Sequence, residues 1–235
     1  MCGLFFRVAD RASSPLSRKP APEGVIPLDK DGLKGSVDWH REKKTVEKKT
    51  LTTRGRNPLD RALLAQTVQN YKRLEKAFPT IESITRRPSF GENLIINGFA
   101  SSDVCVGDVF HVLREIDGSE SVVAVIQVGN PRRPCHLIKS EHSQEVCHYS
   151  ASHALAGLFF RVLQPGSICE GDRIKLHERI HPKWNLEKIA KLFYSETNLA
   201  YKIPRWTGKE EEIQEILDIP ELSMYWYGIE SLYYC

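Results

Sequence analysis

The spacing of apolar residues predicts one amphipathic helix before the middle of the chain. Five large apolar residues recur at steps of 4, 3, 3 and 4, namely Leu64, Val68, Tyr71, Leu74 and Phe78. This spacing places them on one face of an α-helix. Pro79 then ends the helix, because proline lacks an amide hydrogen and its ring clashes with the preceding turn. We therefore expect a helix over residues 64–78.

The hydrophobic pattern changes between Phe90 and Leu176. Short stretches rich in β-branched and aromatic residues alternate there with glycine–aspartate turns, namely Gly107-Asp108, Asp117-Gly118 and Gly171-Asp172. Residues 122–128 form a nearly continuous apolar run, as expected for a strand that is buried on both faces. Many short strands joined by such turns favour a small, mostly antiparallel barrel or sandwich over residues 90–176.

A helical pattern begins after His181-Pro182. Three apolar stripes at helical spacing follow, and they comprise Leu186, Ile189, Ala190 and Phe193, then Ile213, Ile216 and Leu217, then Leu222, Trp226, Ile229 and Tyr233. Asn185 is a suitable N-cap for the first helix, and Thr207 with Glu210 forms a capping box before the second. We predict a mainly β domain over residues 1–180 and a small C-terminal three-helix subdomain over 181–235.

The composition is that of a globular protein and argues against several other classes. Of the 235 residues, 41% are hydrophobic and 27% are charged, which is enough to bury a real core. A net charge of +3 gives no reason to expect a nucleic-acid partner. There is no apolar run of about 18 residues, so we expect no membrane span. The six cysteines are widely scattered and the chain does not start like a signal peptide, so we expect a cytoplasmic protein.

The hexapeptide Gly-Leu-Phe-Phe-Arg-Val occurs twice, at residues 3–8 and 157–162. No longer repeat surrounds the two copies, so we interpret them as two similar strands of a barrel. Residues 41–56 are rich in Lys, Arg and Thr, and a solvated loop is the favoured interpretation over a nucleic-acid patch.

Residues 126–135 carry the strongest chemical signal in the chain. An apolar run ends in a Gly-Asn-Pro turn, and Arg132 and Arg133 then lie between two prolines, directly before Cys135. Positive charges favour the thiolate form of a cysteine, which ligates soft metals and attacks electrophiles. The arginines are suited to bidentate binding of a phosphate or carboxylate group. We therefore predict a metal or redox site at Cys135, with ordinary packing as the alternative.

A second candidate segment is Phe-Gly-Glu-Asn-Leu at residues 90–94. Gly91 permits a close backbone approach, and the amide of Asn93 offers a donor and an acceptor to a heterocyclic ligand. Alone the segment is a weak signal, since it also suits a turn that leads into a strand. The signal becomes stronger because the same chain also contains the loop of Cys135.

Two further segments offer other chemistries. A group of cysteines and histidines suggests zinc, and it comprises Cys135, His136, His142, Cys147, His148 and His153. Their spacing matches no common structural-zinc pattern, so histidines at loops and helix ends are the simpler explanation. The start Met1-Cys2-Gly3 resembles the N-terminal nucleophile of class II glutamine amidotransferases, but nothing downstream supports that resemblance.

Taken in order, these segments resemble the MOSC domain, the C-terminal domain of molybdenum cofactor sulfurases. The likeness comes closest to its stand-alone, YiiM-like subgroup, and it is strong over residues 57–235. The matching motifs are Asp60-Arg61-Ala62-Leu63, residues 90–94, residues 103–108, the Gln-x-x-x-Pro-Arg-x-Pro-Cys loop of Gln127 to Cys135, residues 161–172 and the C-terminal helices; the weaker early match is Lys19-Pro20 with Gly32-Leu33-Lys34-Gly35.

The resemblance implies a MOSC β-barrel that holds a molybdenum–pterin cofactor. Cys135 is implied as the metal ligand and catalytic residue, because a thiolate is a suitable soft ligand for molybdenum. The implied cofactor-binding residues are Lys19, Arg61, Gly91, Glu92, Asn93, Arg132 and Arg133. Among them the cations would anchor phosphate, while Glu92 and Asn93 would hold the pterin or order the loop.

The resemblance also implies an activity and its partners. Members of this subgroup reduce N-hydroxylated bases, with electrons from a separate flavoprotein or iron–sulfur protein. A homodimer is a further expectation. Pyridoxal phosphate is not predicted, since the sulfurase domain that binds it is absent and no lysine lies in a suitable context.

The chain departs from the family pattern at three places. Arg54-Gly55-Arg56 stands where the family has His-Gly-Gly, Gly35-Ser36 stands for Gly-Asp, and Ala65-Gln66 stands for His-Tyr. Two alternatives to the reductase therefore stay open. One is a non-catalytic carrier of the cofactor or its sulfur, and the other is a zinc-stabilised binding module built on the cysteines and histidines of residues 135–153.

Overall fold

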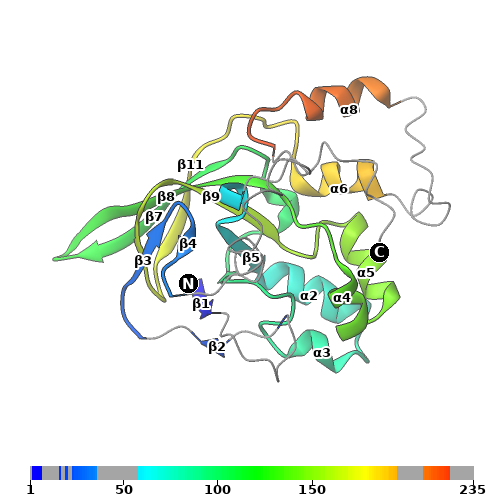
Figure 1. The fold of residues 1–235 in the computed structure, drawn as a ribbon, viewed down its shortest axis with the longest axis horizontal. Coiled ribbons are helices and arrows are strands. Elements are labelled where there is room, and N and C mark those ends of the chain that lie inside the picture. The colour runs from blue at the N-terminus through cyan, green and yellow to red at the C-terminus, as the bar shows by residue number, and fades with distance from the viewer. Residues whose placement is uncertain are drawn as a thin grey trace, which may run out of the picture.

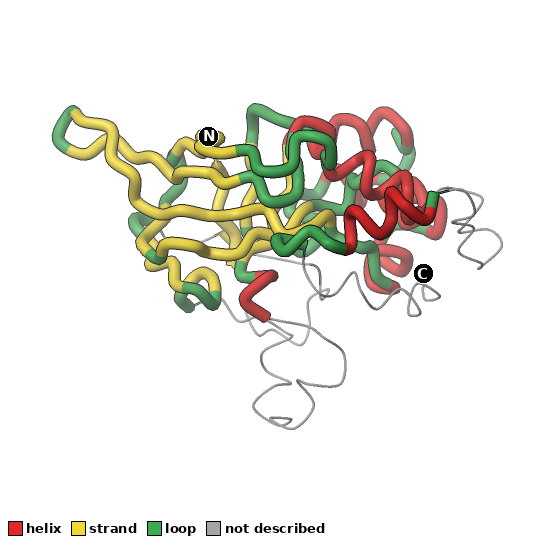
Figure 2. The backbone as a smooth tube through the Cα atoms, turned by 90° about the horizontal axis from the view of Figure 1, so that it is seen from above, coloured by secondary structure: helices red, strands yellow, loops and turns green. Residues whose placement is uncertain are grey.

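The computed structural model describes residues 2–6, 16, 19–20, 23–35, 58–194 and 209–222. Strands occupy one end of the molecule and most helices the other, as Figure 2 shows. Eight of the described strands form a curled, half-barrel sheet, which Figure 1 shows beside the helices α2 to α5. The expectation of a mainly β fold with helices is therefore confirmed.

The main sheet has eight strands in the order β11-β7-β8-β9-β5-β6-β1-β2. Their bounds are β1 Cys2–Phe6, β2 Lys19–Pro20, β5 Leu63–Thr67, β6 Leu94–Ile96, β7 Val109–Ile116, β8 Ser119–Pro131, β9 Leu158–Gln164 and β11 Arg173–Glu178. Neighbouring strands are antiparallel except for β5 and β6, which are parallel. A second, three-stranded sheet orders β10 (Gly166–Ile168), β3 (Ile26–Asp29) and β4 (Gly32–Leu33). The two copies of the hexapeptide contribute to β1 and β9 of the same sheet, as predicted.

The helices are α2 Val68–Ala77, α3 Glu82–Thr85, α4 His136–Glu141, α5 Gln144–Ser152, α6 Leu186–Tyr194 and α8 Glu210–Leu217, with 3-10 turns at Pro58–Arg61 and Ser101–Asp103. Two of them, α4 and α5, lie within residues 90–176, for which the sequence pattern predicted a mostly antiparallel barrel or sandwich. They are short, and α5 mixes its apolar residues with two serines and a histidine, so the sequence shows no long apolar stripe there.

The prediction of a helix over residues 64–78 is wrong at its start. Leu64 lies in β5, which pairs with β9 and β6, and the helix begins at Val68. The Thr67 hydroxyl accepts a hydrogen bond from the Asn70 N–H at 3.0 Å and caps the helix. Leu64 matched the helical spacing because both elements bury their apolar residues in the core. The helix ends before Pro79, as predicted.

The first two helices of the C-terminal pattern are confirmed, but the predicted capping box is not. Asn185 Oδ1 accepts from the Lys188 N–H at 2.8 Å and caps α6, whose apolar stripe is buried. Helix α8 begins at Glu210 with Lys209 as its N-cap residue, so Glu210 does not occupy the third helical position that a capping box from Thr207 requires. Thr207 itself and the third stripe beyond Leu222 lie outside the described residues. Apolar residues of α6 and α8 share one buried cluster with the sheet. The boundary at residue 180 stays a prediction.

The predicted turns at Gly107-Asp108 and Gly171-Asp172 are built alike. In each turn the buried aspartate accepts from the N–H of a cysteine three residues earlier, at 2.9 Å for Asp108 and 2.8 Å for Asp172. Each aspartate also binds a guanidinium through both carboxylate oxygens, with Arg179 on Asp108 and Arg114 on Asp172. These two ion pairs therefore link the ends of the neighbouring strands β7 and β11.

We expect Asp172→Asn to lower the free energy of unfolding at neutral pH by roughly 2 kcal/mol, because Arg114 loses its buried partner. Burial raises the pKa of Asp172, but hydrogen bonds from Arg114 and Cys169 outweigh it and hold that pKa below its ordinary value. The carboxylate therefore stabilises the fold above its unfolded pKa, and this contribution is lost as the pH falls through the folded pKa. Urea unfolding along an acid pH series checks this. An Asp172→Asn protein that loses as much stability in acid as the wild type would contradict it.

Candidate functional site

Cys135 lies on the link between the end of β8 and the start of α4, where it is the N-cap residue. The backbone fixes this link at both ends. The Arg132 N–H donates to the Gly157 carbonyl at 2.8 Å, and the Ile138 N–H donates to the Cys135 carbonyl at 2.9 Å. The side chain of Cys135 is half-buried at the border of an apolar cluster formed by α2 to α5 and neighbouring residues. It is therefore held in place yet partly exposed.

Arg132 joins the two segments that the sequence singled out. Its Nη1 donates to the Phe90 carbonyl, and its Nη2 lies 3.9 Å from Cys135 Sγ. The side chain is half-buried, so the guanidinium lies at the edge of the core beside the thiol. The structure thus places the Cys135 loop against Phe90, the first residue of the segment 90–94.

Glu92 points into the core. It is fully buried, and its two carboxylate oxygens accept from the Tyr71 hydroxyl and from the Phe90 N–H, the latter at 3.0 Å. Burial raises the pKa of Glu92, although hydrogen bonds from Tyr71 and Phe90 oppose the rise. Of the two roles predicted for Glu92, these contacts fit the ordering of the loop.

Gly91 and Asn93 tie the same loop to the sheet. Asn93 exchanges two hydrogen bonds with Leu64, since its Oδ1 accepts from the Leu64 N–H at 3.1 Å and its own N–H donates to the Leu64 carbonyl at 2.7 Å. Gly91 is buried at a φ of 77°, a left-handed conformation that glycine adopts without a steric penalty. These contacts explain both residue types without a ligand, and their part in cofactor binding stays a prediction.

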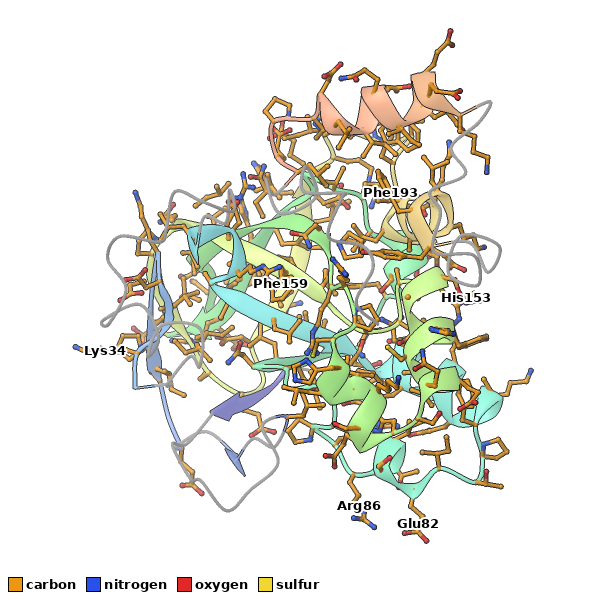
Figure 3. The ribbon with its side chains drawn as sticks, turned by 45° about the vertical axis from the view of Figure 1, so that its right-hand side comes forward. Lys34, Glu82, Arg86, His153, Phe159 and Phe193 are labelled. Atoms are coloured by element: carbon orange, nitrogen blue, oxygen red, sulfur yellow. The ribbon has the colours of Figure 1, made fainter. Side chains whose placement is uncertain are left out.

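The other predicted cofactor-binding cations, Arg61, Arg133 and Lys19, have different surroundings. The Arg61 guanidinium lies 4.8 Å from the centre of the Phe159 ring, and Figure 3 labels Phe159 on β9. Phe159 is two residues from Gly157, which binds the Arg132 backbone, so Arg61 and Arg132 lie along the same end of β9. Arg133 is half-buried, and Lys19 belongs to β2 at the edge of the sheet.

The zinc hypothesis is not supported. Among the described residues, which include all six of its candidates, no three metal-ligating side chains come together. Cys147 is fully buried in the apolar cluster, and His148 bonds to Gln144. His153 is the C-cap residue of α5 and stacks on Tyr149, and Figure 3 labels it beside the end of that helix. The six residues failed to converge because α4 and α5 direct them to different sides.

Sequence reasoning missed the polar contacts around Phe90. Tyr71 had been interpreted as part of an apolar stripe, and His142 as a zinc candidate. His142 stacks on the Phe90 ring with centroids 4.9 Å apart, and its Nε2 lies 3.0 Å from the Ser89 carbonyl. Its Nδ1 lies 2.7 Å from the Ser83 hydroxyl, and burial lowers the pKa of His142. A hydroxyl on an otherwise apolar helix face was the single signal that pointed to Tyr71.

The fold and site define a β-rich protein with a loop cysteine beside an arginine at the end of a sheet strand. The MOSC domain model matches residues 41–175, which is more than half of the chain. The chain therefore belongs to the MOSC domain family.

Curated relatives and solved structures agree with this family. The chain is 34% identical over 107 residues to YflK of Bacillus subtilis, covering 43% of this chain and 44% of YflK. It is 27% identical over 122 residues to YiiM of Escherichia coli, covering 52% of this chain and 50% of YiiM. A protein named "Reductase" from Gibberella moniliformis is 30% identical over 105 residues, covering 44% of this chain and 17% of that protein. The matched segments thus span half or less of these relatives.

Structural likeness extends over nearly the whole chain. The crystal structure of YiiM from Escherichia coli has a TM-score of 0.64 at 19% identity, covering 99% of this chain and 90% of that one. YiiM from Geobacillus stearothermophilus has a TM-score of 0.58 at 20% identity, covering 98% and 95%. At these identities the likeness establishes the fold alone. Within the described part of the chain, no helix has the length and apolar character needed to span a membrane.

Proposed function

We propose that this chain binds a molybdenum–pterin cofactor through the Cys135 thiolate and reduces N-hydroxylated bases or related N-oxygenated compounds. The observation that supports this most is the placement of Cys135, half-buried and with the Arg132 guanidinium 3.9 Å from its sulfur, in a MOSC domain. A soft sulfur donor beside a cation suits a metal bound to sulfur on an anionic cofactor.

Among the cysteines whose side chains the structure describes, Cys135 is the best suited to bind a metal. Cys147 is fully buried among apolar residues. Burial raises the pKa of the Cys105 and Cys169 thiols, and their Asp108 and Asp172 neighbours raise it further, which disfavours the thiolate. Cys135 combines partial exposure with a cationic neighbour, so it fits the group best.

The residues around Cys135 would then have the following roles. Cys135 would hold the metal, which supplies two-electron redox chemistry when it is bound. Arg132 and Arg61, along one end of β9, would bind the anionic part of the cofactor. In the reaction the N–O bond breaks, and two electrons and two protons convert N–OH to N–H and water. A separate flavoprotein or iron–sulfur protein would supply the electrons, and we expect a cytoplasmic protein that can form a homodimer.

The test is to purify the chain from cells that make the cofactor and to measure its metal content and turnover. We expect molybdenum bound to the protein, together with reduction of an N-hydroxylated purine when a reduced viologen dye supplies electrons. Molybdenum without turnover would favour a carrier over a reductase. Zinc, or no metal at all, would contradict the proposed function.

A further inference from the structure

We propose that Tyr71 and Glu92 are positioning residues that act through Phe90 to hold the Arg132 guanidinium beside the Cys135 sulfur. The proposal rests on the proposed function only in taking Cys135 as the working thiol. It joins three segments that are far apart in the sequence, namely α2, residues 89–92 and the loop of residues 132–135.

The hydrogen bonds around Tyr71 have a defined direction. The Ser89 N–H donates to the Tyr71 oxygen at 2.9 Å, and the Ser89 hydroxyl lies 3.3 Å from the same oxygen. The Tyr71 hydroxyl therefore directs its own proton to Glu92 Oε1, while the Phe90 N–H donates to Glu92 Oε2. Both oxygens of the buried carboxylate are thus used to fix the backbone of residues 89–90.

Phe90 connects these hydrogen bonds to Arg132. Its fully buried ring packs edge-on against Tyr71, with centroids 5.9 Å apart, and stacks on His142 on another side. With its N–H held by Glu92 and its ring held by two neighbours, its carbonyl has one orientation. That carbonyl accepts from Arg132 Nη1, which leaves Nη2 facing Cys135 Sγ. Without this anchor a half-exposed arginine would have several rotamers and could turn toward solvent.

The consequence is the position of the Arg132 guanidinium. A guanidinium that donates to the Phe90 carbonyl and lies beside the sulfur is held at the edge of the core, whereas a released one turns toward solvent. The rate at which phenylglyoxal modifies Arg132 in the protein without cofactor therefore reports whether this side chain is held in place. This readout needs neither molybdenum nor a substrate.

The experiment measures modification of the full chain by phenylglyoxal, with the modification at Arg132 quantified by peptide mapping. We expect Tyr71→Phe, which keeps the ring and removes the hydroxyl, to speed the modification of Arg132 roughly three- to tenfold, the effect of losing one hydrogen bond. Glu92→Gln should speed it to a similar extent. The double variant should react no faster than the faster of the two single variants, because both changes act on one chain of contacts.

Tyr149→Phe is the matched control, because Tyr149 packs against the same apolar cluster and loses the same atom. Its Arg132 should be modified at the wild-type rate. If one positioning variant does not fold by circular dichroism, the other decides. Wild-type modification of Arg132 in the folded positioning variants, or a double variant whose effect is the sum of the two single effects, would overturn the proposal. These outcomes are independent of molybdenum content, so failure of the proposed function would be seen separately.

Discussion

Cys135→Ser is expected to abolish molybdenum retention and any reduction of N-hydroxylated compounds, while the chain still folds. A neutral hydroxyl is a far poorer ligand for a soft metal than a thiolate. Serine is nearly the same size, and Cys135 lies at the border of the core, so the loss of stability should be about 1 kcal/mol. Elemental analysis of the purified protein and turnover with a chemical reductant measure the two losses.

Cys147→Ser and Cys169→Ser provide the controls for this prediction. Cys147 is fully buried in an apolar cluster, where a hydroxyl lacks the surroundings that suit it. Cys169 belongs to the turn that Asp172 stabilises. Both variants should change stability more than metal content. Full molybdenum content and full activity in Cys135→Ser would refute the role of Cys135 as the ligand.

Trp184→Ala is expected to give the largest loss of stability, about 3–5 kcal/mol. Trp184 is 2% exposed and belongs to the apolar cluster that joins the sheet to α6 and α8. Its indole N–H donates to Glu215 of α8 at 3.0 Å, and its carbonyl accepts from the Val106 N–H at 3.1 Å. Removing the indole leaves a cavity between these parts and removes one hydrogen bond from Glu215, which keeps its contact with Lys183.

Urea unfolding followed by circular dichroism checks the prediction and also the proposed boundary at residue 180. Because the sheet and α6 share one core, we expect a single transition that moves to lower urea in Trp184→Ala. Val122→Ala is the control, since Val122 is 44% exposed and should change stability by less than about 0.5 kcal/mol. Two separate transitions, with Trp184→Ala altering one of them, would instead show that the C-terminal part unfolds independently.

The amino-acid sequence by itself determined those features that depend on neighbours along the chain. The apolar run before Cys135 became β8, Asn185 capped α6, and Pro79 followed the end of α2. Period, capping and turn chemistry are local properties, so they can be recognised before the fold is known. The same holds for the order of motifs that resembled the MOSC family, which the family model then confirmed.

The tertiary structure decided which side chains meet. Leu64 fitted a helix by its spacing, yet its pairing with β9 made it part of a strand. Glu92 was expected to hold a cofactor or to order its loop, and packing buries it fully against Tyr71. His142 was a zinc candidate and packs on Phe90. Arg132 reaches both the Phe90 carbonyl and Cys135 because β8 ends beside residues 89–92. Such contacts depend on how distant segments pack together. The pattern of residues along the chain does not show which of these segments pack against one another.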